Sequence, residues 1–168
     1  MEGRFMKKIT KNELTLNSIK ATQFNEFDLY QLADISYEHG SPWQIHVFKN
    51  DLVLAYVDYL VLHDEHQLIG FIGYRQIFEE IEVTNIVIHP TFKKQGLAQL
   101  LLTSLVETVE NAEMIHLEVR VSNRQGIQLY EKNGFKEIGI RPNYYQNPYE
   151  DAKLMQLEIN QEKSEINV

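Results

Sequence analysis

The sequence of 168 residues is long enough for one domain with a sizeable core, and 43% hydrophobic and 24% charged residues are ordinary for a globular protein. Because cysteine is absent and the six histidines show no metal-ligand spacing, disulfides and cysteine nucleophiles are excluded and no metal site is expected. The net charge of −8 argues against a nucleic-acid partner and better suits a cationic one, such as an amine or a basic peptide, although acidity can also serve solubility alone.

Hydrophobic periodicity predicts the elements of the first half of the chain. They are, in order, a strand at about residues 14–19, helices at 23–38 and 41–51, and strands at 52–62 and 68–78. Gly40 is the expected cap of the first helix, and Ser41 is the expected N-cap of the second, with Pro42 at its first position. No apolar run is long enough to span a bilayer, and the N-terminus lacks the apolar core of a secretion signal, so we expect a cytoplasmic protein.

The second half alternates strands and helices and predicts one mixed α/β sheet domain over residues 12–159. The expected elements are a strand at 83–89, a helix at 97–110, a strand at 115–121, a helix at 123–132, and strands at 135–139 and 152–159. Residues 141–150 are polar and rich in tyrosine, which indicates a loop. Residues 1–11 and 160–168 are polar, and we expect them to be flexible termini.

Residues 83–98 combine a strand, a turn with two lysines and a glycine, and the start of a helix. Such a helix N-terminus leaves backbone N–H groups unpaired and favours an anion, while Gly96 allows a close approach of the backbone. Lys93 and Lys94 add positive charge that suits a pyrophosphate. The spacing matches neither a dinucleotide-binding glycine fingerprint nor a P-loop. On the plainer interpretation, Gly96 only begins an ordinary helix after a turn.

Glu118 is the first candidate for chemistry, because it lies on the polar side of an alternating strand. Burial there would favour a general base, but the spacing alone more often indicates a residue on a solvated face. Tyr130, in the following helix, could be a core aromatic or a proton donor to a leaving thiolate. Asn123 could be a plain N-cap or a cap that also touches a cofactor.

Several motifs resemble the GCN5-related N-acetyltransferases, the GNAT superfamily. The six residues Lys93-Lys94-Gln95-Gly96-Leu97-Ala98 resemble its acyl-CoA-binding motif, Gln/Arg-x-x-Gly-x-Gly/Ala, with lysine at the first position. Further segments are similar to the RimI-type ribosomal-protein alanine N-acetyltransferases of that superfamily. These segments are Thr84 to Pro90, Leu117 to Asn123, Ile127 to Phe135, and Arg141-x-x-Tyr144-Tyr145 followed by Glu150-Asp151-Ala152-x-x-Met155, with a weaker match at Ser41-Pro42-Trp43.

The resemblance implies a GNAT fold and direct transfer of an acetyl group from acetyl-CoA to a protein N-terminal α-amine, such as the N-terminal alanine of a small-subunit ribosomal protein. Glu118 would be the general base, and Tyr130 the acid that protonates the CoA thiolate. The resemblance also implies two sets of contacts. The residues implied to contact acetyl-CoA are Ile86, Val87, Ile88, Lys93, Lys94, Gln95, Gly96, Leu97, Ala98, Asn123 and Tyr130. Those implied to contact the acceptor are Asn85, Tyr144 and Tyr145.

Alternatives remain at this point. Tyr144 and Tyr145 could be two rings on an exposed loop. The chain could also acetylate a small amine, such as a polyamine or an aminoglycoside, or be a non-catalytic module that binds acyl-CoA.

Overall fold

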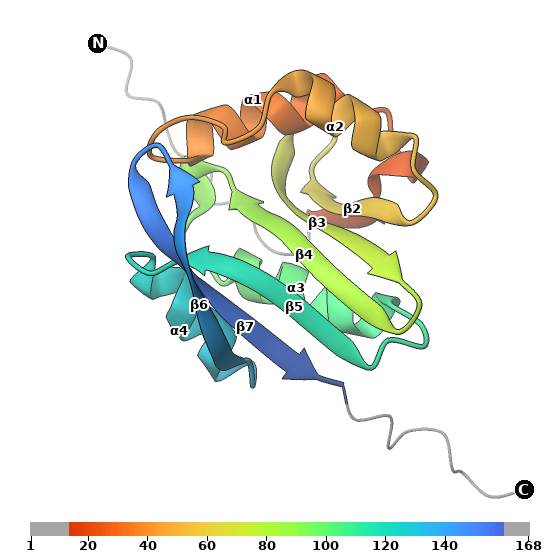
Figure 1. Cartoon of the computed structure of the whole chain (residues 1–168). Coiled ribbons are helices and arrows are strands. Elements are labelled where there is room, and N and C mark those ends of the chain that lie inside the picture. The colour runs from red at the N-terminus through yellow and green to blue at the C-terminus, as the bar shows by residue number, and fades with distance from the viewer. Residues whose placement is uncertain (1–13, 160–168) are drawn as a thin grey trace, which may run out of the picture.

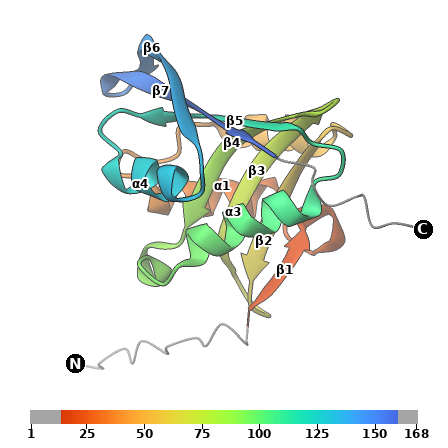
Figure 2. The same cartoon turned by 90° about the horizontal axis from the view of Figure 1, so that it is seen from below.

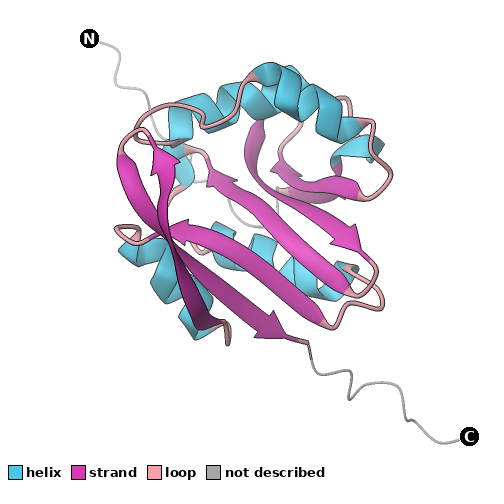
Figure 3. Ribbon diagram, viewed as in Figure 1, coloured by secondary structure: helices cyan, strands magenta, loops and turns pink. Residues whose placement is uncertain are grey.

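The predicted strands and helices assemble into one mixed sheet with helices on both faces (Figures 1 and 3). The computed structural model describes residues 14–159, so the expected flexible termini, residues 1–11 and 160–168, lie outside the described residues. The elements are β1 (Thr15–Ser18), α1 (Glu26–Ser36), α2 (Ile45–Leu52), β2 (Val57–His63), β3 (Leu68–Ile77), β4 (Glu80–Ile88), α3 (Leu97–Thr108), β5 (Met114–Arg120), α4 (Arg124–Lys132), β6 (Lys136–Gln146) and β7 (Tyr149–Glu158), with 3₁₀ turns at Ile19–Ala21 and Pro90–Phe92. This order confirms the predicted one.

Two hydrophobic cores fill the two sides of the sheet, whose strand order is β1-β2-β3-β4-β5-β7-β6. Leu29 of α1 and Phe48 of α2 belong to one core, and Leu101 of α3 and Ile127 of α4 belong to the other. Figures 1 and 2 show the two helix pairs on opposite sides of the strands. Alternate strand residues contribute to the two cores, because successive side chains point to opposite faces of a sheet.

The caps predicted at Gly40 and Ser41 are both wrong. Helix α1 ends at Ser36 with Tyr37 as its cap, and Gly40 adopts its positive φ of 77° only in the turn that follows. The Ser41 hydroxyl accepts a hydrogen bond from the Trp43 backbone N–H at 3.3 Å and donates one to the Trp43 carbonyl at 2.7 Å. Short polar side chains often satisfy such local backbone groups outside helices, and α2 accordingly begins later than predicted.

Two strands also differ from their predicted bounds. Strand β2 begins only at Val57, because α2 is followed by a turn in which the Leu54 N–H donates to the Asp51 carbonyl at 3.0 Å. The expected loop at residues 141–150 is instead a hairpin, in which β6 continues to Gln146 and pairs with β7 around the cis Asn147–Pro148 bond. β6 is an edge strand of the sheet and largely exposed, so its residues are polar and do not show the hydrophobic pattern that predicts a strand.

Candidate active site

Strands β4 and β5 form the parallel pair of the sheet, and they separate halfway along their length. Their pairing runs from Glu80 with Met114 to Val83 with Leu117 and stops there. Figure 1 shows the two strands diverging toward their C-terminal ends. Beyond Val83, backbone groups of β4 on the side of β5 have no sheet partner within residues 14–159. A segment such as 86–88 can therefore offer N–H groups to a ligand between the strands.

Asn85 lies just past this separation and has an unpaired amide group. The residue is only 7% exposed, its Oδ1 accepts a hydrogen bond from the Thr84 hydroxyl at 3.2 Å, and its Nδ2 has no partner among the described residues. Thr84 forms a bulge opposite Gly73 and Tyr74 of β3. A Cβ atom on Gly73 would collide with Asn85 Oδ1, so the glycine makes room for this side chain. A buried donor without a partner fits a carbonyl supplied by a ligand.

The predicted anion site at the start of α3 has the backbone that the sequence suggested. Gly96 is the N-cap in the left-handed conformation, with φ of 75° and ψ of 18°, and no side chain caps the helix. Its first N–H groups therefore have no intrahelical partner and can bind an anion. Lys94 and Gln95 are exposed beside it, whereas the Leu97 side chain is buried in the core and can contribute only its backbone.

Lys93, the residue that departs from the family motif, lies exposed at the same turn and is directed toward α1. Its Nζ donates a hydrogen bond to the Ser36 carbonyl at 3.2 Å, at the last residue of that helix. A cation at a helix C-terminus is favourable, because the carbonyls there carry partial negative charge. The lysine thus connects the anion-binding turn to the segment between α1 and α2.

Glu118 lies on the polar side of β5, as predicted, but it is neither fully buried nor unpaired. Its side chain is 22% exposed, and its Oε1 lies 2.7 Å from Nη1 of Arg141 in β6. The Arg141 guanidinium also lies 5.0 Å from the centroid of the Tyr144 ring. The carboxylate raises the pKa of the Tyr144 hydroxyl, which shows that this ring, too, faces Glu118.

Tyr130 belongs to a group of tyrosines that approach one another from three elements. It lies in α4 at 9% exposure, Tyr37 lies at the end of α1, and Tyr145 lies in β6. Burial raises the pKa of all three hydroxyls, and their proximity raises the pKa of Tyr37 and Tyr130 further. Tyr130 is therefore protonated at neutral pH, which is the form that can donate a proton.

The hairpin that carries Tyr144 and Tyr145 is anchored to β5 by an arginine. The Arg120 guanidinium lies 4.2 Å from the Tyr145 ring centroid and donates to the Asn147 and Pro148 carbonyls at 3.2 and 3.0 Å. It also pairs with the Glu150 carboxylate at 3.2 Å. Figure 1 shows the tip of this hairpin toward the end of α1, which agrees with the effect of Tyr145 in raising the pKa of Tyr37.

The site residues predicted from the sequence did not include Tyr37, Arg120, Arg141 or Glu150. Arg141 and Glu150 stand in the motif that carried the resemblance, and Arg120 follows Glu118 at the spacing of one strand face, so a signal existed for these three. No pattern pointed to Tyr37 at a helix end. Asn123, for its part, is the N-cap of α4, accepting a hydrogen bond from the Gly126 N–H at 2.9 Å.

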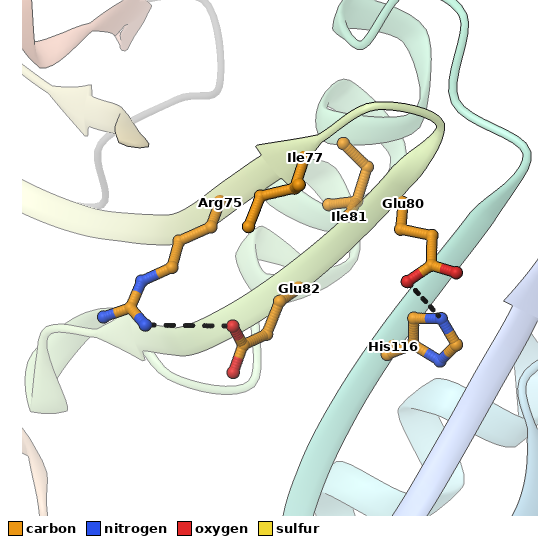
Figure 4. Close-up of a pocket in the computed structure, with 6 residues that line it drawn as sticks. All are labelled: Arg75, Ile77, Glu80, Ile81, Glu82 and His116. Atoms are coloured by element: carbon orange, nitrogen blue, oxygen red, sulfur yellow. Dashed lines mark ion pairs between the residues drawn. The ribbon is translucent and has the colours of Figure 1, made fainter. Parts of the chain in front are cut away.

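A small pocket lies farther along the same strands (Figure 4). It is lined by Arg75, Ile77, Glu80, Ile81, Glu82 and His116. The close-up shows Arg75 directed toward Glu82 and His116 directed toward Glu80, with nitrogen–oxygen distances of 3.9 Å in both pairs. Because His116 and Glu118 are two residues apart in β5, the pocket opens on the same face of the sheet as Glu118.

Within 14–159 no three histidine or acidic side chains gather as a metal would require. No helix there is both long enough and apolar enough to cross a membrane.

A parallel strand pair that opens beside an uncapped helix N-terminus offers backbone N–H groups both to a carbonyl and to an anion, as a protein that binds an acyl-CoA requires. The sequence profile of the Acetyltransferase (GNAT) family matches residues 23–135, and the chain belongs to this family. It is therefore an acetyl-CoA-dependent N-acetyltransferase with the GNAT fold.

Similar proteins share the fold over most of the chain. A Bacillus subtilis (strain 168) protein, named as a candidate ribosomal protein bS18-alanine N-acetyltransferase, is 38% identical over 124 residues, covering 72% of this chain and 82% of its own. The crystal structure of the ribosomal-protein-S18-alanine N-acetyltransferase from Escherichia coli is 28% identical with a TM-score of 0.79, covering 92% of this chain and 99% of that one. A GNAT family acetyltransferase from Elizabethkingia anophelis with acetyl-CoA bound has the same fold at 23% identity, with a TM-score of 0.71 and coverages of 89% and 100%.

Proposed function

We propose that the enzyme acetylates the N-terminal α-amine of a protein that begins with alanine, with a small-subunit ribosomal protein as the acceptor. The observation that carries this proposal is the position of Glu118, which faces Arg141 and Tyr144 of a hairpin anchored to the same strand. A wall of this kind can hold a peptide, whereas a short amine does not need it. The names of the B. subtilis and E. coli proteins support the same acceptor class.

Glu118 is proposed as the general base. An α-amine has a pKa near ~7.7–8.0, so the base needs to shift its protonation equilibrium only modestly at neutral pH. The carboxylate takes one proton from the α-ammonium, directly or through a water, and leaves the nitrogen lone pair free to attack. Acetyl-CoA supplies the acetyl group as a thioester, whose C–S bond breaks as the new C–N bond forms.

Tyr130 is proposed as the acid that protonates the leaving CoA thiolate. Burial keeps its hydroxyl protonated, as this role requires. The attacking nitrogen loses a second proton, which restores the tyrosine through the surrounding water. For each acetyl group transferred from an ammonium substrate, one proton is released overall.

The proposed acetyl-CoA contacts are supported by the geometry of two backbone segments, the start of α3 and residues 86–88. The uncapped start of α3, from Gln95 to Ala98, fits the pyrophosphate, and Lys94 adds charge there. Backbone N–H groups of residues 86–88 are proposed to polarise the thioester carbonyl. Lys93 is engaged by the Ser36 carbonyl, so its contribution to the pyrophosphate would require that hydrogen bond to be exchanged.

The acceptor contacts are proposed along the face of the sheet that carries Glu118. Tyr144 and Tyr145 would wall the groove, and the free amide of Asn85 would donate to a peptide carbonyl. Glu80 and Glu82, exposed in the neighbouring pocket, would meet basic residues that follow the terminal alanine.

The test measures CoA release from acetyl-CoA with a panel of acceptors. The panel holds matched peptides beginning with Ala, Ser, Met or acetyl-Ala, each with a basic continuation, together with spermidine and an aminoglycoside. We expect turnover with the free Ala peptide, none with its blocked form, and a large loss in Glu118→Gln. The double variant Tyr144→Ala/Tyr145→Ala should raise KM for the peptide.

Other outcomes would replace the proposal. Turnover on the small amines alone, unaffected by the double tyrosine variant, would establish a small-amine acetyltransferase. Acetyl-CoA binding with no turnover on any acceptor, in both the wild type and Glu118→Gln, would indicate a non-catalytic module.

A further inference from the structure

The Glu118 carboxylate shares its site with a fixed cation. The 2.7 Å distance to Arg141 Nη1 is that of a charge-assisted hydrogen bond. A guanidinium keeps its charge at every pH at which an enzyme works. An ammonium that arrives at this site therefore meets a neutralised pair rather than a free carboxylate.

Arg141 is held by its strand as well as by the ion pair. It is the register partner of Ala152 in β7, and the bulge that follows it, residues 142–144, is fixed by a hydrogen bond from Asn143 N–H to Asp151 Oδ1 at 2.8 Å. Tyr144, at the end of this bulge, lies against the guanidinium. Because these contacts hold Arg141 in place, we expect the Glu118–Arg141 ion pair to persist when an acceptor binds.

Within residues 14–159, Arg141 is the cation that pairs with Glu118. Tyr144 and Tyr145 of β6 face Glu118, and the negative charge of Glu82 in β4 reaches Tyr144. Arg120 is engaged by the hairpin carbonyls and its own carboxylate partner. Arg141 is thus the group that balances the charge of Glu118.

The amines that could react at this site differ in pKa and therefore in the fraction that is neutral. At about pH 7.5, an α-amine with a pKa near ~7.8 is roughly one-third neutral, whereas a lysine-like amine with a pKa near ~10.4 is only about 0.1% neutral. An α-ammonium is acidic enough to give its proton to the paired carboxylate, directly or through a water. A strong base arrives as an ammonium and must pass its proton to a carboxylate that already has a partner.

We propose that Arg141 is a specificity-determining residue, which makes the site select weakly basic α-amines over strong bases such as lysine side chains and polyamines. This inference rests on the proposed function, with Glu118 as the base and a protein N-terminus as the acceptor. It adds a reason for the selectivity that is independent of the shape of the groove.

The test compares kcat/KM for three acceptors at one pH. They are a lysine-free peptide with a free N-terminal Ala, an acetyl-Ala peptide of the same length with one lysine, and spermidine. Arg141→Met removes the charge and keeps an apolar stem, Arg141→Lys keeps the charge, and Arg141→Gln is a second neutral variant in case the first does not fold. Lys153→Met is the matched control. It removes a cation from the same hairpin, but the partner of Lys153 is Glu137, at 2.9 Å, and not Glu118.

In the wild type, we expect kcat/KM to be higher for the free Ala peptide than for either strong base. In Arg141→Met this ratio of kcat/KM values should fall about two- to fivefold, the factor typical of a partly exposed ion pair. Arg141→Lys and Lys153→Met should keep the wild-type preference. Equal changes for all three acceptors in Arg141→Met would overturn the inference and leave the proposed function intact. A wild-type enzyme that prefers the strong bases would instead overturn the proposed function.

Discussion

Replacing Arg120 with Met should loosen the β6–β7 hairpin and weaken acceptor binding without affecting acetyl-CoA. The change removes two hydrogen bonds to the Asn147 and Pro148 carbonyls, the pair with Glu150, and the stacking on Tyr145. Because the arginine side chain is 27% exposed, each hydrogen bond is worth about 1 kcal/mol rather than its full buried value. With about 0.5–1 kcal/mol for the cation–π contact, the total loss is about 2–4 kcal/mol.

Three assays report this loss. A domain of this size loses about 2–4 °C of Tm per kcal/mol, so Tm should fall by roughly 5–15 °C if the hairpin unfolds with the rest of the domain. Amide hydrogen exchange should accelerate chiefly within residues 141–150. KM for the Ala peptide should rise about tenfold, whereas KM for acetyl-CoA should change less than about twofold, because the α3 site is built from other residues.

The control is Lys132→Met, which removes an exposed cation that has no ion pair among the described residues. It should leave Tm, exchange and both KM values near those of the wild type. The reasoning would be refuted if Arg120→Met raised KM for acetyl-CoA as much as KM for the peptide, or if hydrogen exchange at 141–150 stayed at the wild-type rate.

Three further predictions address other parts of the site. Tyr130→Phe should lower kcat about 10²–10⁴-fold. Because burial raises the pKa of this hydroxyl, the pH–rate profile of the wild type should show no alkaline decline below about pH 10. A decline near pH 8–9 would contradict the role of Tyr130 as the acid. Gly73→Ala should cost about 1–3 kcal/mol in a denaturant titration and raise the peptide KM, because its Cβ would collide with Asn85 Oδ1; an unchanged peptide KM would show that Asn85 does not bind the acceptor. Glu82→Gln should raise KM for a basic peptide about two- to fivefold at low salt, and the effect should vanish near 1 M salt and for a peptide with a neutral continuation; a salt-independent effect would argue against charge recognition.

Local patterns predicted the fold well where hydrophobic periodicity was strong. The β-branched run before Pro90, the helix that begins at Leu97 and the alternating strand around Glu118 all formed as expected. The sequence did not predict the positive φ of Gly96, which glycine adopts without the steric cost of a Cβ atom. These elements position the start of α3 and residues 86–88, the two segments that offer backbone N–H groups to a ligand.

The features that the sequence did not predict depend on contacts between distant segments. The partner of Glu118 lies 23 positions along the chain, and the hairpin that carries it reads as a loop because an edge strand is solvated on both sides. Lys93 reaches a carbonyl at the end of α1, and no local pattern indicates such a contact. Ser41 was misassigned because a serine before a helix can satisfy the backbone in more than one way.

The most direct test of the central claim identifies the nitrogen that receives the acetyl group. A peptide with a free N-terminal alanine, an internal lysine and a basic continuation is incubated with acetyl-CoA and the enzyme, then fragmented by mass spectrometry. We expect acetylation of the alanine α-nitrogen, with a rate about 10²–10⁴-fold lower in Glu118→Gln. Acetylation of the lysine side chain instead, or an equal rate in Glu118→Gln, would contradict it.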